Sequence, residues 1–67
     1  MRKILLNDEQ IEIIKYVKQG LTNIEIGEEL GYSSHTIKKK LKHLYKIFYA
    51  NGRVDFVAKI LNYQILD

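Results

Sequence analysis

Hydrophobic residues recur three and four positions apart along most of the chain, the spacing that places them on one face of an α-helix. The pattern is interrupted at Gly20, at Gly31 and over residues 49–52. Glycine commonly stands just past the end of a helix. The sequence therefore predicts an all-α fold in one domain over residues 1–67, with helices at about 8–19, 23–30, 34–48 and 53–65.

The first three predicted helices begin at recognisable capping residues. Asn7 with Gln10, and Thr22 with Glu25, have the three-residue spacing of a capping box, and Ser33 is the expected cap of the third helix. Only residues 31–33 separate the short second helix from the longer third one. A short helix, a tight turn containing glycine and a longer helix are typical of the helix-turn-helix unit.

The third helix has two contrasting faces. Its apolar stripe is predicted to face the core and consists of Ile37, Leu41, Leu44 and Phe48. At about 100° per residue, the opposite arc holds basic side chains and one histidine: His35, Lys38, Lys39, Lys42 and Lys46.

Charge is unevenly distributed along the chain. The net charge is +3, but residues 30–54 contain six basic residues and no acidic one, whereas residues 1–29 contain four basic and six acidic residues. A block of one sign attracts polyanions, because lysines that neutralise phosphates release counterions. Nucleic acid is the first expected partner and an anionic membrane surface the second. The ordinary alternative is that the lysines only form a solvated helix face.

Composition excludes several other classes of protein. The chain has no cysteine, so disulfides, thiolate zinc sites and cysteine nucleophiles are absent. No apolar run approaches the roughly 20 residues of a membrane span, and we expect a cytoplasmic protein. Ser33, Ser34 and His35 are adjacent but have no acidic neighbour in the sequence. His43 is about 12 Å from His35 along a helix, too far to share a metal. We predict no catalytic residue, metal or cofactor.

The fourth predicted helix is apolar on two sides. One face comprises Val54, Val57, Ala58, Leu61 and Ile65; the other comprises Phe56, Ile60 and Tyr63. A small domain can cover only one such face from within, so we expect Phe56, Ile60 and Tyr63 to form a dimer interface. The alternative is that these three side chains pack internally against Tyr16 or Tyr49.

Placing the third helix in a DNA major groove assigns roles to its polar residues. Lysines near its start would reach base edges, where lysine favours the acceptors of guanine: Lys38, Lys39 and Lys42. Further along the helix, and at the starts of the second and third helices, side chains and free N–H groups would meet phosphates. The predicted backbone contacts are Thr22, Asn23, Ser34, His35, Thr36, Lys40 and Lys46.

The sequence resembles the LuxR-type (GerE-type) helix-turn-helix domain of bacterial regulators. The resemblance covers nearly the whole chain and is carried by residues 20–26, Leu30, Ser33, Thr36, Ile37, Lys38, Leu41, Tyr45, Arg53, Val54, Asp55 and Val57. It implies a winged-helix-like three-helix core, whose third helix reads the major groove, followed by a helix that pairs two copies. It also implies base contacts at Lys38, Lys39 and Lys42. We expect a stand-alone form of this domain, controlled by its abundance or by a partner.

The leading hypothesis is a sequence-specific transcriptional regulator that binds a pseudo-palindrome in double-stranded DNA as a homodimer. The alternative is a small interaction protein that pairs through its fourth helix with a larger LuxR-type regulator and modulates it. RNA polymerase is a further expected partner of such a transcriptional regulator. Non-specific binding to nucleic acid is a third hypothesis. An enzyme is the least supported class.

Overall fold

Four helices account for most of the chain in the computed structural model, which describes residues 4–62. They are α1 (Asp8–Lys18), α2 (Asn23–Leu30), α3 (Ser34–Ile47) and α4 (Arg53–Leu61), and no strand occurs in the described part. The all-α prediction is confirmed, and the first three helices end within one residue of the predicted positions. The fourth ends at Leu61, and residues 63–65 of its predicted range lie outside the described residues.

Side-chain caps fix where α1, α2 and α3 begin. In the first capping box the Gln10 backbone N–H donates to Asn7 Oδ1 at 2.7 Å, and the Asn7 backbone N–H donates to Gln10 Oε1 at 2.9 Å. Thr22 and Glu25 form the second box in the same way. Each cap satisfies backbone donors that have no partner inside the helix. These local predictions are confirmed.

The start of α4 uses a different device. Gly52 precedes the helix and makes no side-chain cap. Instead the Asn51 N–H donates to Asp55 Oδ2 at 2.8 Å, and this bond, together with Lys59, lowers the pKa of the Asp55 carboxyl. A carboxylate in the first turn also interacts favourably with the helix dipole.

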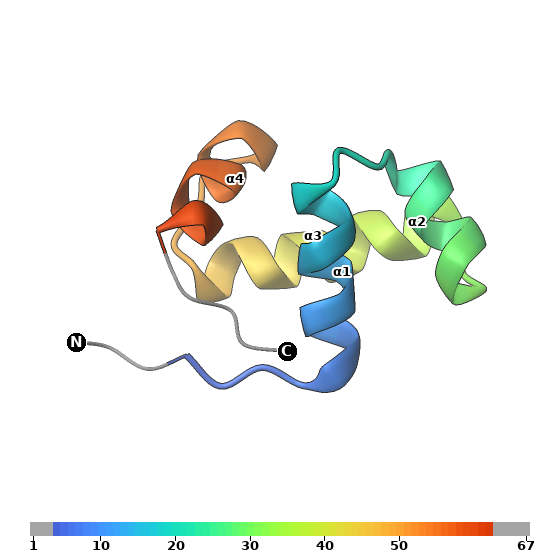
Figure 1. Cartoon of the computed structure of the whole chain (residues 1–67), viewed down its shortest axis with the longest axis horizontal. Coiled ribbons are helices and arrows are strands. Elements are labelled where there is room, and N and C mark those ends of the chain that lie inside the picture. Colours follow the sequence, from blue (N-terminus) through green and yellow to red (C-terminus); the bar gives the residue numbers. More distant parts are fainter. Residues whose placement is uncertain (1–3, 63–67) are drawn as a thin grey trace.

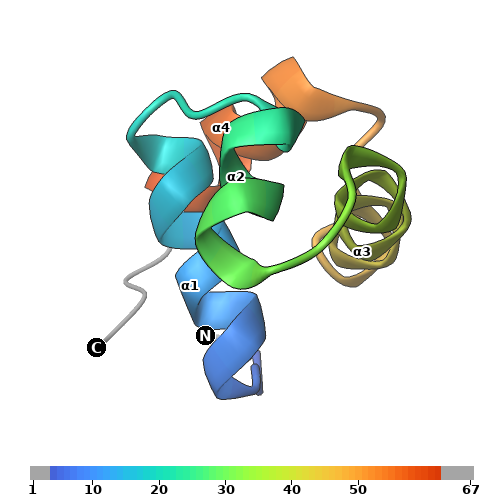
Figure 2. The same ribbon diagram turned by 90° about the vertical axis from the view of Figure 1, so that its right-hand side faces the viewer.

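The helix-turn-helix unit is α2, the turn at residues 31–33, and α3. Gly31 ends α2 with a φ of 80°, a left-handed conformation that glycine adopts without steric cost. The N–H groups of Gly31 and Tyr32 both donate to the Gly27 carbonyl, at 2.8 and 2.9 Å. The turn therefore folds back on the end of α2 and directs α3 across it. Figure 2 shows α3 end-on beside α1 and α2.

Gly27 is required by this turn. A Cβ atom at this position would lie 2.3 Å from the Tyr32 carbonyl oxygen and 3.3 Å from its carbon. Alanine would raise helix propensity by about 1 kcal/mol, but relieving a clash with backbone costs about 1–3 kcal/mol or more. We expect Gly27→Ala to lower the thermal midpoint measured by circular dichroism. Gly52→Ala is the control, since Gly52 has an extended φ of 172° and nothing within 4 Å of its Cβ position. A raised midpoint for Gly27→Ala would contradict the packing described here.

The core lies where all four helices meet. Figure 1 shows α2 near the start of α3 and α4 near its end, with α1 crossing between them. The predicted α3 stripe is buried, as are residues of the other three helices. The core residues are Ile13, Ile14, Val17, Ile26, Ile37, Leu41, Leu44, Phe48, Phe56 and Ile60. None of the helices described is long and apolar enough to cross a membrane.

The orientation of α4 corrects the sequence prediction. Phe56 and Ile60, expected at a dimer interface, have 0% of their surface exposed within a single chain. The ring of Phe56 packs on Tyr45 and Phe48, with centroid distances of 5.0 and 5.4 Å. Side chains without exposed surface cannot contact another protein, so this assignment is wrong. Internal packing is correct for Phe56 and Ile60, with Tyr45 and Phe48 as ring partners of Phe56.

The opposite side of α4 is the one left open. Val54 is 87% exposed and Leu61 is 65% exposed, and Ala58 is exposed between them. These positions are four and three residues apart, so they form one stripe along the helix. The third expected interface residue, Tyr63, lies outside the described residues.

Candidate nucleic-acid interface

The exposed face of α3 is basic along its length. Lys38, Lys39, Lys42 and Lys46 are all exposed, together with His35 near the start of the helix. The helix contains no acidic residue, and its opposite side is fixed in the core by Ile37, Leu41 and Leu44. Burial of the apolar stripe therefore holds these cations toward solvent on a rigid element, where they can meet an extended polyanion.

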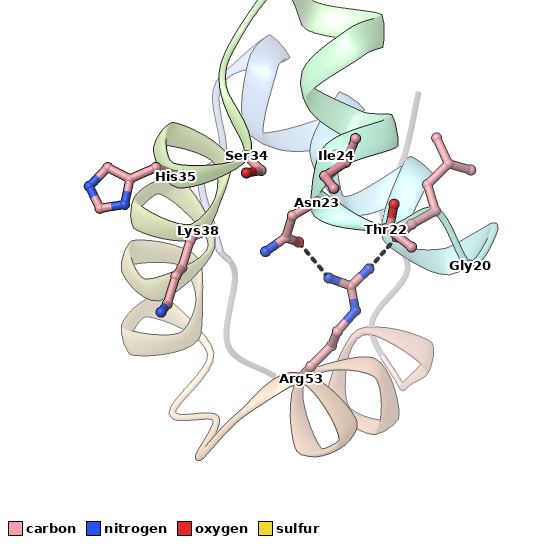
Figure 3. A pocket seen from close by; sticks show the side chains of 9 residues that line it. Gly20, Thr22, Asn23, Ile24, Ser34, His35, Lys38 and Arg53 are labelled. Carbon is pink, nitrogen blue, oxygen red and sulfur yellow. Dashed lines mark hydrogen bonds between the residues drawn. The ribbon is translucent and has the colours of Figure 1, made fainter.

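A groove lies beside this face, between the N-terminal ends of α2, α3 and α4 (Figure 3). It gathers predicted contact residues from two separate segments with an arginine from a third. Its lining consists of Gly20, Leu21, Thr22, Asn23, Ile24, Ser34, His35, Lys38 and Arg53. No acidic side chain is among them. The groove is thus suited to an anionic ligand.

Arg53 is the charged lining residue that the sequence did not predict at the site. It is the first residue of α4, and its Nη1 donates to Asn23 Oδ1 at 2.8 Å while its Nη2 donates to the Leu21 carbonyl (Figure 3). The Asn23 and Arg53 positions are 30 residues apart. Helical periodicity gives no information on contacts at that separation, and no local motif could have identified this one.

Lys40 lies apart from the other predicted contact residues. It was expected to contact DNA phosphate, but its Nζ lies 2.9 Å from Glu9 Oε1 and 4.7 Å from the centroid of the Tyr32 ring. At about 100° per residue it is roughly 160° around α3 from Lys42. Its charge is paired with α1 on another side of the helix, so the structure does not bring Lys40 to the basic face.

Glu9 joins α1 to the turn as well as to α3. The Tyr32 hydroxyl donates to its carboxylate. This hydrogen bond and the Lys40 ammonium lower the pKa of Glu9, and the same hydrogen bond raises the pKa of Tyr32. An anionic Glu9 therefore connects the turn of the helix-turn-helix unit to the first helix.

The threonine hydroxyls predicted at phosphates already take part in caps. Thr22 Oγ1 accepts from the Glu25 N–H at 3.2 Å, and Thr36 Oγ1 accepts from Ser33 Oγ at 3.0 Å. Thr22 is exposed and lines the groove, whereas Thr36 is half-buried. Of the predicted backbone contacts, Thr22, Asn23, Ser34 and His35 lie together in the groove, and Lys46 lies further along α3.

Metal binding has no support in the described part of the chain. Within residues 4–62, no group of three or more His, Cys, Asp or Glu side chains is placed to hold a metal ion. The arrangement offers cations and hydrogen-bond donors on a convex helix and in an open groove, which is chemistry for binding an anion.

Comparison with known families decides which class of anion binder this is. A model of the GerE family, described as bacterial regulatory proteins of the LuxR family, matches residues 5–60. The chain belongs to the LuxR family of bacterial regulatory proteins. No curated protein and no solved structure matches it significantly. This LuxR-family domain is a DNA-binding helix-turn-helix regulator, a class that does not consist of enzymes.

The family match and the geometry agree. The matched range includes the whole helix-turn-helix unit, the basic face of α3 and Arg53. Lys40 is within it too, although its side chain is paired with Glu9.

Proposed function

We propose that this LuxR-family protein is a sequence-specific transcriptional regulator that places α3 in the major groove of double-stranded DNA. The observation that carries the proposal is the acid-free basic face of α3, held opposite a fully buried stripe. Its 14 residues give a helix about 21 Å long, and a major groove about 12 Å wide admits one helix. Bacterial DNA as the partner implies action in the cytoplasm.

Within this arrangement, lysines near the start of α3 read bases. Lys38, Lys39 and Lys42 are exposed and are long enough to reach the O6 and N7 acceptors of guanine. Phosphate contacts come from Thr22, Asn23, Ser34, His35, Thr36 and Lys46. Because phosphate contacts carry no sequence information directly, specificity depends on the three lysines and on DNA shape.

We further propose that two copies bind a pseudo-palindrome and pair through the open face of α4. Val54, Ala58 and Leu61 replace the wrongly predicted Phe56 and Ile60 as the contact residues. An exposed apolar stripe on a helix favours burial against another surface, and a second copy offers an identical stripe. Each copy of α3 would then enter one of two half-sites that are one turn of the DNA helix apart.

Val54→Asp and Leu61→Asp test the dimer. Each places a charge on the open face of α4, so we expect monomers in sedimentation equilibrium with unchanged helical content. The affinity for a palindromic duplex should fall at least tenfold and approach the affinity for a duplex with one half-site. The reason is that the two copies no longer bind together. Leu5→Asp is the matched control, since Leu5 is 85% exposed outside α4. A wild-type monomer with equal affinity for both duplexes would contradict this proposal.

The open α4 face also supports one rival function, pairing with a larger LuxR-family regulator. If that rival holds, Lys42→Glu is harmless in a reporter assay while Leu61→Asp abolishes regulation. The proposed DNA-binding function predicts loss with both variants. Ile60 is unsuitable for this comparison because it is buried, and a charge there would unfold the domain.

A further inference from the structure

Arg53 connects α4 to the turn that precedes α2. Its two Nη groups donate to different acceptors on that turn, the Leu21 carbonyl and Asn23 Oδ1. Both bonds are partly buried. The guanidinium group is planar and rigid, so two bonds in fixed directions define the position of both acceptors.

The bond to Asn23 determines which way its amide points. An asparagine side chain has one acceptor oxygen and one donor NH₂ group. If the amide turned over, its NH₂ would face the N–H groups of Arg53, two sets of donors without an acceptor between them. The oxygen therefore stays toward Arg53, and Figure 3 shows the amide nitrogen pointing away from it, toward the side of α3 that carries Lys38.

The Asn23 NH₂ group, which points away from Arg53, is placed to donate to a ligand in the groove. It lies in the groove with Ser34 and His35, which are proposed to meet the DNA backbone, and with Lys38, which is proposed to read a base. A phosphate oxygen accepts hydrogen bonds from neutral amides as well as from cations. The same arginine holds the Leu21 carbonyl, one residue before the Thr22 cap of α2.

We propose that Arg53 is a positioning residue for DNA binding, which orients the Asn23 amide to donate to a backbone phosphate. This inference rests on the proposed function. Because Arg53 is the first residue of α4, the helix that carries the open apolar face also fixes a phosphate contact in the groove.

A double-mutant cycle tests the inference on an operator duplex. Asn23→Ala should lower affinity about tenfold or more, since it removes a hydrogen bond to a charged group. Arg53→Ala should cost at least as much, and the double variant should be no worse than Arg53→Ala alone. Losses that multiply would overturn the inference, because they would show that the two residues act independently.

Two further readouts separate positioning from other roles. Arg53→Ala should leave the slope of log affinity against log salt unchanged; a slope reduced by about one would make Arg53 itself a phosphate ligand and overturn the inference. Asn23→Asp keeps acceptors for Arg53 but has no NH₂ donor, so it should remain folded by circular dichroism and bind DNA at least tenfold more weakly. This variant keeps the test valid if Arg53→Ala does not fold.

DNA binding by the wild-type protein distinguishes a failure of this inference from a failure of the proposed function on which it rests. If wild-type protein binds its operator and Asn23→Asp binds equally well, only the positioning role fails. If wild-type protein prefers no duplex over another, the proposed function fails and the inference fails with it.

Discussion

Replacing Phe56 by alanine is expected to remove a large part of the protein's folding stability. Phe56 is fully buried, and its ring joins α4 to Tyr45 and Phe48 at the end of α3. Truncating a buried phenylalanine costs about 3–5 kcal/mol. A domain of 67 residues has a total stability of only about 3–10 kcal/mol. Denaturant unfolding followed by circular dichroism measures the loss.

The control for this variant is Val54→Ala on the open side of the same helix. Val54 is exposed in a single chain, so its truncation should change stability of the monomer by no more than about 0.5 kcal/mol. The comparison also tests the orientation of α4. A Phe56→Ala protein that stays fully stable but loses dimerisation would place Phe56 at the interface and contradict the packing described here.

Reversing one charge on the basic face of α3 should have the largest effect on DNA binding. We expect Lys42→Glu to lower affinity for the operator more than about 100-fold. Losing a specific base contact costs about 1–3 kcal/mol, and the new carboxylate is repelled by the phosphates. Lys42 is exposed and outside the core, so the thermal midpoint should stay within a few degrees of the wild-type value.

Lys18→Glu separates a specific contact from a change in net charge. It alters the charge of the protein by the same amount, but Lys18 is an exposed residue at the end of α1 and does not line the groove. We expect its effect on affinity, measured by fluorescence anisotropy at fixed salt, to stay below about fivefold. Equal losses for the two variants would mean that α3 makes no specific contact at Lys42.

Local signals explain why the sequence predicted so much of this fold. The capping boxes at Asn7 and Thr22 and the glycine at residue 31 act over three to five residues, so their geometry follows from the residue types alone. The stripe of α3 was equally readable, because this helix is apolar on one side and charged on the other. A single apolar face leaves no choice of orientation.

The orientation of α4 could not be predicted in this way. With apolar residues on two faces, periodicity does not say which face is inward. The aromatic pair Tyr45 and Phe48, at the far end of α3, provides the surface that Phe56 covers. Which face packs inward is therefore decided by tertiary contacts between helices and not by the pattern within one.

The same limit applies to the polar contacts of Lys40 and Arg53. Both belong to the region with an excess of positive charge, which suggested DNA contacts for Lys40 and no role for Arg53. The structure pairs Lys40 with Glu9, and Arg53 with Asn23, across long separations in the chain. Charge distribution along a sequence identifies the kind of ligand, but the partner of each side chain depends on the fold.

Selection of duplexes from a randomised DNA library by the purified protein tests the central claim most directly, followed by affinity measurements on selected and scrambled duplexes at two salt concentrations. A sequence-specific dimer should enrich a motif with twofold symmetry and bind it about 10³-fold or more tightly than scrambled DNA at both salt concentrations. Absence of an enriched motif, with equal and strongly salt-dependent affinity for every duplex, would contradict the claim and leave only non-specific binding by the basic face.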